Sequence, residues 1–544
     1  MDRLPLAHAL LDALKAYGAA EIFGIPGDFA LPFFKEIEAY PVLPLRTLSH
    51  EPGVGFAADA AARWRSSLGV AAITYGAGGL NMINPVAQAY AEKSPVVVIS
   101  GAPGAAERRL GLGLHHQVKH FDSQRLVYRE VTVADCVLDD PDRAPAEIAR
   151  VLTAARLYSR PVYIEVPRDM VRVPVAPVPP FAPPAADAET VRAAARACLA
   201  ALKAAARPVL MLDVEVRRYG LESQAAALAR ALRIPTTLTF MGRGMLVGQD
   251  APLIAPYFGL AGDAAAREAV EGSDCLMMLG VLLCDTNFGV SASLIDPRRM
   301  IRAVDREVRF PTHVYPEVPL ADLIAAMLEE AEPVADAAPA PAPAAPSGLE
   351  RDGAAIAPGD VTKAVNDLFA LHGPMPIASD MGDCLFATIE MTATQLVAPA
   401  YYATMGAGVP MGLGLEAASG ERSLVLVGDG AFQMTGWELG NARRLGLKPL
   451  VLVFNNRAWG MLKVFQAETR YNDLDDWRFA EMAPLLGGVG RRVTTRAELW
   501  EALVEAHADR DNWRLVEIMI PRDVYSPVLE RFVGAVKAKT FTSR

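Results

Sequence analysis

Asp429 and Asn456 each follow a short apolar run, and their side chains could bind one metal ion. Residues 423–427 and 449–455 are Val/Leu-rich runs that read as buried strands, and residues 431–445 between them have helical spacing. A right-handed strand–helix–strand unit makes the two strands parallel, so their carboxyl ends open at the same edge of a sheet. Asp429 and Asn456 then offer two oxygen ligands to one hard cation.

The turn after the first run is rich in glycine and suits an anionic group beside the cation. Its residues are Gly428, Asp429, Gly430 and Ala431. The two glycines let backbone N–H groups and the following helix N-terminus approach a diphosphate closely. The Gly-Asp-Gly turn followed by Asn456 resembles the signature of thiamine diphosphate enzymes. By that resemblance, Mg²⁺ is held by the Asp429 and Asn456 side chains and by the carbonyl of Ala458.

A second Gly-rich turn near the N-terminus repeats this pattern. Residues 76–82 (Gly-Ala-Gly-Gly-Leu-Asn-Met) echo residues 428–434 (Gly-Asp-Gly-Ala-Phe-Gln-Met), and each copy precedes a helical stretch, a proline and a Val/Leu-rich run. Two copies of one unit indicate two related domains, with coincidence between two Gly-rich turns as the alternative. Ala77 stands where the second copy has Asp429, so only the C-terminal copy can bind the metal in this way. In thiamine enzymes one such domain binds the diphosphate, and its relative, usually from another subunit, holds the aminopyrimidine.

The composition is that of a globular enzyme and argues against several classes of partner. At 544 residues the chain exceeds a single core, so about two to four domains are expected. The formal net charge of −10 argues against nucleic acid or an anionic membrane as a partner. Five cysteines without CxxC spacing predict reduced structural thiols. The first residues do not resemble a signal peptide, and no apolar run could span a bilayer, so we expect a cytoplasmic protein.

Two proline-rich stretches, residues 174–184 and 335–348, divide the chain into three blocks. The blocks are residues 1–173, 188–332 and 355–544. Each alternates apolar runs with amphipathic stretches, which predicts parallel strands covered by helices on both faces. The expected fold class is therefore α/β, with three doubly wound parallel-sheet domains in series. By the resemblance these are the pyrimidine-binding, middle and diphosphate-binding domains of a thiamine diphosphate enzyme.

Glu51 is the candidate for activating such a cofactor. It follows a predicted strand, residues 43–48, and begins a helix of small residues. A glutamate at a helix start is ordinarily a cap or a dipole partner, which is the alternative role. Thiamine diphosphate needs a carboxyl group against pyrimidine N1′, so that its exocyclic nitrogen can deprotonate the thiazolium ring. Beside the thiamine signature, we therefore assign Glu51 to catalysis and to cofactor binding.

Asp28 and the adjacent His115 and His116 narrow the class of reaction. Alone, the histidine pair is more typical of a loop or structural pair. Together with the Pro-Gly-Asp-Phe stretch around Asp28, it resembles the 2-oxo acid decarboxylases, the pyruvate and indolepyruvate decarboxylase group. There an aspartate and two histidines handle protonation of the enamine intermediate and release of the aldehyde. By the same resemblance, Met405 supports the V shape of the cofactor, and the Ala403 carbonyl accepts a hydrogen bond from its 4′-amino group.

One position departs from this family. Members usually carry a glutamate six residues after the metal-binding asparagine, where this chain has Leu462. We hypothesise that Asp285 takes part of the missing role, since the matching middle-domain segment approaches the active site in the family. The alternative is that Asp285 caps a turn or pairs with a cation. Asp285 thus joins Glu51, Asp28 and the histidine pair as a candidate catalytic residue.

Leu462 also makes the predicted substrate pocket more apolar. Met461, Leu462 and Phe465 share one predicted helix, and apolar side chains so spaced are more often part of a core. In the family, however, this helix lines the substrate site. An apolar pocket favours a bulky aromatic 2-oxo acid over pyruvate. The chain most resembles the phenylpyruvate and indolepyruvate decarboxylases, and its sequence does not rank these two substrates.

The resulting hypothesis is a thiamine diphosphate- and Mg²⁺-dependent lyase. It would convert phenylpyruvate or indole-3-pyruvate to the aldehyde and CO₂ without oxidation, through a thiamine diphosphate enamine. One alternative is a carboligase of the same superfamily, of the acetolactate synthase or benzaldehyde lyase type. Another is a non-catalytic cofactor-binding subunit. Because two subunits hold each cofactor in the family, we expect a homodimer or homotetramer with active sites at the subunit interface.

Overall fold

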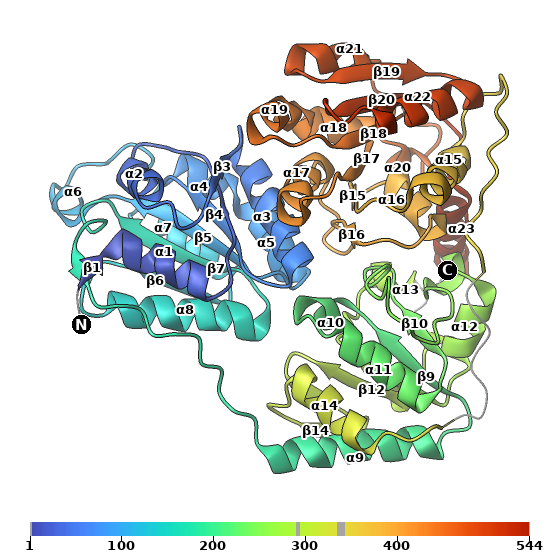
Figure 1. Cartoon of the computed structure of the whole chain (residues 1–544), viewed down its shortest axis with the longest axis horizontal. Coiled ribbons are helices and arrows are strands. Elements are labelled where there is room, and N and C mark those ends of the chain that lie inside the picture. Colours follow the sequence, from blue (N-terminus) through green and yellow to red (C-terminus); the bar gives the residue numbers. More distant parts are fainter. Residues whose placement is uncertain (1–2, 290–293, 335–342, 543–544) are drawn as a thin grey trace. The chain divides into compact units, whose positions relative to one another are not determined.

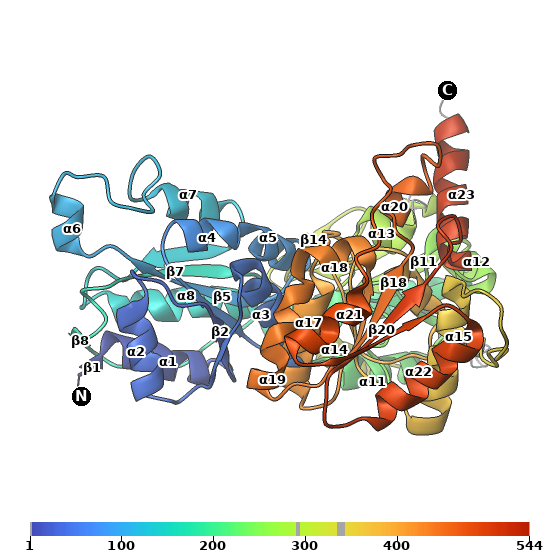
Figure 2. The same cartoon turned by 90° about the horizontal axis from the view of Figure 1, so that it is seen from above.

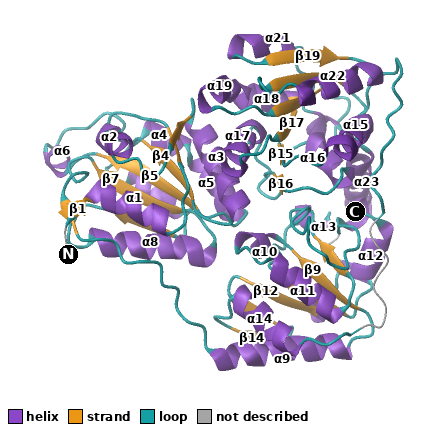
Figure 3. Ribbon diagram, in the orientation of Figure 1, coloured by secondary structure: helices purple, strands orange, loops and turns teal. Residues whose placement is uncertain are grey.

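The computed structural model describes residues 3–289, 294–334 and 343–542. The predicted linker 335–348 therefore lies partly outside the described residues. The chain divides into two compact units. The first comprises Met1–Pro184, Pro410–Glu421 and Trp437–Leu447, and the second comprises Ala185–Val409, Arg422–Gly436 and Lys448–Arg544. The described residues form three six-stranded sheets and one two-stranded sheet, with helices beside each large sheet (Figure 3).

The first large sheet lies in the first unit and is entirely parallel, with the strand order β3-β2-β4-β5-β7-β6. Its strands are β2 (Ile22–Gly24), β3 (Leu45–Thr47), β4 (Gly69–Ile73), β5 (Val96–Ala102), β6 (Ala134–Val137) and β7 (Val162–Pro167). The helices of this part are α1 (Leu6–Ala16), α2 (Leu31–Ala39), α3 (Glu51–Arg65), α4 (Ala77–Asn81), α5 (Ile83–Ala91), α6 (Ala105–Arg109), α7 (Ser123–Arg129) and α8 (Ala144–Tyr158).

Both faces of this sheet are buried. Val97 and Ile99 of β5 belong to the core that α1, α2 and α8 complete (Figure 1). Val96 and Val98 point to the opposite face, because side chains alternate along a strand, and they are fully buried as well. Burial of successive residues is what the continuous valine run predicted for a parallel strand.

The C-terminal sheet confirms the predicted internal repeat. Its order is β16-β15-β17-β18-β20-β19 with all neighbours parallel, so both sheets follow the order 2-1-3-4-6-5 when strands are counted along the chain. Its strands are β15 (Ile377–Ser379), β16 (Leu396–Val397), β17 (Leu424–Gly428), β18 (Leu450–Asn455), β19 (Val489–Val493) and β20 (Arg514–Met519). The helices in this part of the sequence are α15 (Pro358–His372), α16 (Asp383–Ala387), α17 (Gly408–Ser419), α18 (Asp429–Thr435), α19 (Ala442–Leu445), α20 (Gly460–Lys463), α21 (Phe479–Met482), α22 (Arg496–Ala508) and α23 (Pro527–Thr542). Most of α17 and all of α19 belong to the first unit.

The middle sheet is mixed, which refines the α/β prediction. Its order is β10-β9-β11-β12-β13-β14, and the last two strands run antiparallel to their neighbours. Asp305 and Arg306 join β12 to β13 with φ of 53° and 60°, the backbone of a tight hairpin turn. The strands are β9 (Pro208–Leu212), β10 (Thr236–Leu238), β11 (Cys275–Leu279), β12 (Met300–Val304), β13 (Glu307–Arg309) and β14 (Val314–Tyr315). The helices are α9 (Ala188–Ala204), α10 (Val214–Arg218), α11 (Glu222–Leu232), α12 (Ala264–Glu271), α13 (Asp285–Phe288) and α14 (Leu320–Glu330).

Two local predictions change. The helix predicted over residues 431–445 begins earlier, at Asp429, and is interrupted by a 3₁₀ segment, Gly436–Asn441, between α18 and α19. The predicted connector 174–184 begins with β8 (Pro174–Val175), which pairs antiparallel with β1 (Leu4–Pro5).

All five cysteines are free and buried, as their spacing predicted. Among the described residues, no helix combines the length and apolar character needed to cross a membrane.

Candidate functional site

The Asp429 and Asn456 side chains converge on one backbone amide. Asp429 is the first residue of α18, directly after β17, and Asn456 directly follows β18, the parallel neighbour of β17. The Ala458 N–H lies 3.3 Å from Asp429 Oδ2 and 3.0 Å from Asn456 Oδ1, and it donates to both. The structure thus brings together the two side chains that the motif predicted at one sheet edge.

The chemistry of this pair suits a hard cation. Asp429 is only 3% exposed, and burial raises its pKa to about 7 although backbone N–H groups, such as that of Gly430, favour the charged form. A carboxylate buried among amides gains from a cation, because desolvation disfavours its negative charge. Carboxylate and amide oxygens are ligands that Mg²⁺ accepts.

The two glycines of the turn have different surroundings. A Cβ at Gly430 would lie 2.5 Å from Cδ1 of Trp459, so a side chain there would displace the indole ring. A Cβ at Gly428 would meet no atom within 4 Å, which leaves the backbone before α18 accessible. Ala431 lies buried in the first turn of α18. The open backbone at Gly428 fits the diphosphate predicted there.

Asp380 holds the loop that carries Ala403 and Met405. Asp380 directly follows β15, and it accepts hydrogen bonds from the N–H groups of Gly406 (3.0 Å) and Gly408 (2.7 Å). Ala403 has a φ of 61°, a left-handed conformation that residues with a side chain rarely adopt. The loop is therefore held in a specific conformation, and Asp380 supplies two of the contacts that hold it.

Two threonine side chains are associated with this loop: Thr404 is part of it, and Thr435 contacts it. Thr435 Oγ1 donates to the Gly406 carbonyl at 2.6 Å. The Thr404 hydroxyl is buried, and it forms a hydrogen bond with none of the described residues. A buried hydroxyl without a partner costs free energy, so this position fits a bound group that carries a polar atom.

Asp380 is a candidate functional residue to which the sequence motifs assigned no role. It is fully buried, and burial raises its pKa to about 7 against the lowering effect of the amides of Gly408, Gly406 and Met381. A signal for it does exist in the sequence. Asp380 directly follows a short apolar run, as Asp429 follows the glycine that ends β17, and acidic residues at such strand ends face the functional edge of a parallel sheet.

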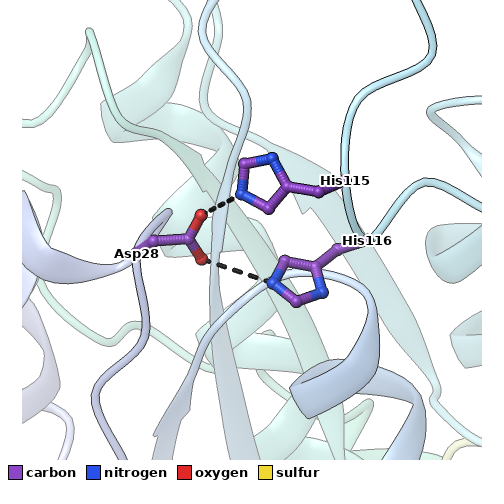
Figure 4. Close-up of side chains that lie close together, drawn as sticks. All are labelled: Asp28, His115 and His116. Atoms are coloured by element: carbon purple, nitrogen blue, oxygen red, sulfur yellow. Dashed lines mark hydrogen bonds and ion pairs between the residues drawn. The ribbon is translucent and has the colours of Figure 1, made fainter.

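In the first unit, Asp28, His115 and His116 form one cluster (Figure 4). Nε2 of His115 hydrogen-bonds Asp28 Oδ2, and Nε2 of His116 lies 3.6 Å from Asp28 Oδ1. Burial works to raise the pKa of Asp28, but the hydrogen bond from His115, the Phe29 amide and the two imidazoles outweigh it and hold the pKa below its usual value. The structure therefore brings these three residues together, and their role in catalysis stays a prediction.

The histidines sit on the loop between α6 and α7, shown in light blue in Figure 2. Gly76, with a φ of 70°, lets this loop pack closely, because a Cβ there would lie 2.2 Å from the His116 carbonyl oxygen. The buried Gln124 accepts from the Gly76 N–H at 2.6 Å and donates to Tyr163 at 2.6 Å. Gln124 thus ties the Gly-rich turn to strand β7, a contact that local spacing could not reveal.

Glu51 is the first residue of α3, preceded by His50 in extended conformation. Asn81 Nδ2 donates to Glu51 Oε2 at 2.8 Å, and Asn81 belongs to the Gly-rich turn that repeats the Gly-Asp-Gly motif. Glu51 is half-buried in the single chain. Asn81 Nδ2 also lies 2.8 Å from His50 Nε2, and its contact with Glu51 is to Oε2, so the second carboxylate oxygen, Oε1, could serve a proton of a bound group.

Asp285 begins the short helix α13 and is exposed. Its carboxylate accepts from the adjacent Thr286 N–H at 2.9 Å. Asn287 anchors the helix, because its side-chain Nδ2 donates hydrogen bonds to the buried Asp213 at 2.8 Å and to the Leu282 carbonyl. An exposed carboxylate on an anchored helix can meet a ligand, but the Thr286 contact also fits the alternative role as a cap. The catalytic role of Asp285 stays a prediction.

The predicted pocket residues occupy a shorter helix than expected. Met461 is partly buried against an apolar cluster that contains Phe240 and Leu385, whereas Leu462 is 54% exposed. Phe465 lies beyond α20, which ends at Lys463, and its N–H donates to the Leu462 carbonyl at 3.1 Å. These apolar side chains remain available to a substrate or a partner, and their role in the pocket stays a prediction.

The residues present fit thiamine diphosphate with Mg²⁺. Oxygen ligands converge beside an accessible backbone at Gly428, and the partnerless Thr404 hydroxyl marks a place for a polar atom. Asp429, Asn456 and the Ala458 carbonyl would hold the cation, and Ala403 and Met405 lie on the loop held by Asp380. Glu51, which belongs to the first unit, would supply the carboxyl group that the pyrimidine ring of such a cofactor requires.

Comparisons with known proteins identify the family of each domain. Residues 5–126 match the family model of the N-terminal domain that binds thiamine pyrophosphate (thiamine diphosphate) in thiamine pyrophosphate enzymes. Residues 195–331 match the central domain of these enzymes, and residues 380–518 match their C-terminal cofactor-binding domain. Each match lies within one of the three predicted blocks.

Curated relatives cover nearly the whole chain. The chain is 56% identical over 537 residues to an indole-3-pyruvate decarboxylase of Azospirillum brasilense, which covers 98% of both chains. It is 30% identical to an alpha-keto-acid decarboxylase of Mycolicibacterium paratuberculosis, over 94% of this chain and 93% of the relative. It is 29% identical to an alpha-keto-acid decarboxylase of Mycobacterium tuberculosis, over 97% of this chain and 96% of the relative.

Proposed function

The chain belongs to the thiamine diphosphate-dependent 2-oxo acid decarboxylases, and from this premise we propose that it decarboxylates an aromatic 2-oxo acid. The substrate would be indole-3-pyruvate or phenylpyruvate, and the products the aldehyde and CO₂. The observation that carries the proposal is the 56% identity over 98% of the chain to an indole-3-pyruvate decarboxylase. Leu462 supports it, because a leucine there favours an apolar ring over a small polar substrate.

When bound, thiamine diphosphate supplies the nucleophilic carbon and the electron sink that decarboxylation requires. The Glu51 carboxylate holds a proton for the pyrimidine ring. Asn81 orients this carboxylate by donating a hydrogen bond to Oε2. Asp28 keeps the two imidazoles oriented through their Nε2 atoms, so that His115 and His116 can donate and accept protons as the aldehyde is released. Asp429 and Asn456 would hold the Mg²⁺ ion that neutralises the diphosphate.

The first experiment offers four 2-oxo acids in parallel to the enzyme with thiamine diphosphate and Mg²⁺. With indole-3-pyruvate, phenylpyruvate, benzoylformate and pyruvate, we expect aldehyde formation with the two arylpyruvates to be the fastest. Chromatography of the products separates aldehyde from acyloin. A preference for pyruvate would contradict the apolar pocket, and acyloin as the main product would favour the carboligase alternative.

Asp285 can be tested by the substitution Asp285→Asn. If it replaces the missing family glutamate, we expect kcat for the arylpyruvates to fall by about 10²-fold, the lower end for a general acid or base. The pH dependence of kcat should change as well. Asp263→Asn is a matched control, because Asp263 caps α12 by accepting from Ala266 N–H at 2.9 Å. Unchanged turnover and pH dependence in D285N would leave Asp285 as a cap only.

The proposal has three further parts. The metal is Mg²⁺, the chain assembles into a homodimer or homotetramer, and the protein is cytoplasmic. The oxygen donors of Asp429 and Asn456 support Mg²⁺. Family membership supports assembly, since thiamine enzymes hold each cofactor between subunits. Exposed aromatic and apolar side chains such as Trp437, Leu462 and Tyr471 are also consistent with an interface.

A further inference from the structure

The cluster of Asp28, His115 and His116 has the ligand set of a zinc site. One carboxylate oxygen of Asp28 and one ring nitrogen from each histidine lie within 4.8 Å of one another. Nε2 of His116 is 3.6 Å from Asp28 Oδ1, close to the spacing of about 3.4 Å between neighbouring ligands of tetrahedral Zn²⁺. Small side-chain rotations would therefore place all three atoms around one ion.

The surroundings of the cluster fix its geometry before any ion binds. The His115 ring stacks on the buried Phe29 at a centroid distance of 4.9 Å and an interplanar angle of 23°. The backbone of His116 is held against Gly76, where a Cβ would lie 2.4 Å from His116 Cβ. A preoriented ligand set loses less conformational entropy when it binds an ion.

The cluster is also accessible, and its ligand types discriminate between metals. The side chains of His115, Asp28 and His116 are 64%, 40% and 32% exposed in the single chain. Imidazole nitrogens favour Zn²⁺ and similar transition ions, whereas Mg²⁺ prefers the oxygens found at Asp429 and Asn456. Excess Mg²⁺ should therefore leave this cluster free for Zn²⁺.

We propose that Asp28, His115 and His116 form a regulatory site for Zn²⁺, with a fourth ligand position open to water or to a carboxylate. A zinc ion there would occupy the lone pairs that otherwise accept protons, so bound zinc would inhibit the decarboxylase. Only this inhibitory consequence rests on the proposed function, because binding itself depends on the three side chains alone.

Cobalt spectroscopy tests the binding. The holoenzyme, with thiamine diphosphate and millimolar Mg²⁺, is titrated with Co²⁺, whose visible absorption reports nitrogen and oxygen ligands, and Zn²⁺ is then added as a competitor. We expect one ion per chain, displaced by Zn²⁺. His115→Gln and His116→Gln should each weaken binding more than about tenfold, the lower limit seen when even an outer partner of a ligand is lost.

His120→Gln is the matched control, since His120 is exposed on the same loop outside the cluster. It should bind Co²⁺ as the native enzyme does. Should the cluster variants fail to fold, X-ray absorption of the native zinc-loaded enzyme decides, with two imidazoles and one carboxylate expected. Unweakened binding in H115Q and H116Q, or a ligand set without imidazole, would overturn the site.

Activity assays test the inhibition separately. Added Zn²⁺ should suppress arylpyruvate decarboxylation in excess Mg²⁺, and a zinc-selective chelator should restore it. Zinc binding without inhibition would overturn the regulatory role. An enzyme that forms no aldehyde even without zinc would contradict the proposed function, while the cobalt titration would still decide whether the site exists.

Discussion

Replacing Glu51 by glutamine is expected to lower kcat for the arylpyruvates by about 10²–10⁴-fold, the range contributed by a general acid or base. Glutamine keeps the shape of the side chain and can still accept the hydrogen bond that Asn81 donates to Glu51 Oε2. It cannot hold or release the proton that the pyrimidine ring requires. Steady-state aldehyde formation measures the loss, and equilibrium binding of thiamine diphosphate should stay within a few-fold of the native value.

The matched control is Glu38→Gln, which makes the same chemical change at an exposed position on α2. E38Q should retain native turnover and cofactor affinity. The assignment of Glu51 would fail if E51Q kept more than about a tenth of native kcat, since that loss is too small for an essential proton carrier. Lost cofactor binding would instead identify Glu51 as a structural contact.

Local sequence patterns predicted those parts of the site whose residues lie close together in the sequence. The β17–α18 turn and β18 are contiguous runs with a strong apolar signal, so their spacing was enough to place Asp429 and Asn456 at one sheet edge. The two related turns likewise predicted two related sheets, and the structure shows the same strand order in both.

The remainder depends on contacts that sequence spacing does not encode. Gln124 reaches Gly76 across 48 residues, and Asp380 reaches Gly408 across 28. The antiparallel edge of the middle sheet follows from positive φ at Asp305 and Arg306, residues that lack the usual glycine signal of such a turn. Tertiary packing therefore decided these features, whereas local propensity decided the strands.

Asp380→Asn is expected to weaken thiamine diphosphate binding by about 10–100-fold, equivalent to losing one charge-assisted hydrogen bond of about 1.5–3 kcal/mol. An amide has a single acceptor oxygen, so its NH₂ group would face one of the amides that the carboxylate now accepts, at Gly406 or Gly408. The loop that carries Ala403 and Met405 would lose part of its support. Cofactor titration of the variant measures the effect directly.

The pH dependence of stability in the same variant separates a positioning role from a structural one. Burial raises the pKa of Asp380 from 3.8 to about 7, so between these pH values the folded chain holds a proton that the unfolded chain has released. The native contribution of Asp380 to stability is therefore complete below pH 3.8 and is lost as pH rises through about 7. Asparagine has no such loss, and D380N should gain stability relative to the native protein across this window.

Chemical denaturation of the two apo proteins at several pH values measures the difference between their free energies of unfolding. Other buried groups titrate in both proteins, so their contribution cancels in this difference. Asp367→Asn is the matched control, because Asp367 also accepts two backbone amides, from Gly348 at 2.7 Å and Leu349 at 2.8 Å. D367N should leave cofactor affinity unchanged. Native cofactor affinity in D380N would show that the loop does not depend on Asp380. Weaker cofactor binding together with equal or greater stability above pH 7 would show that this buried carboxylate stabilises the cofactor loop and not the fold.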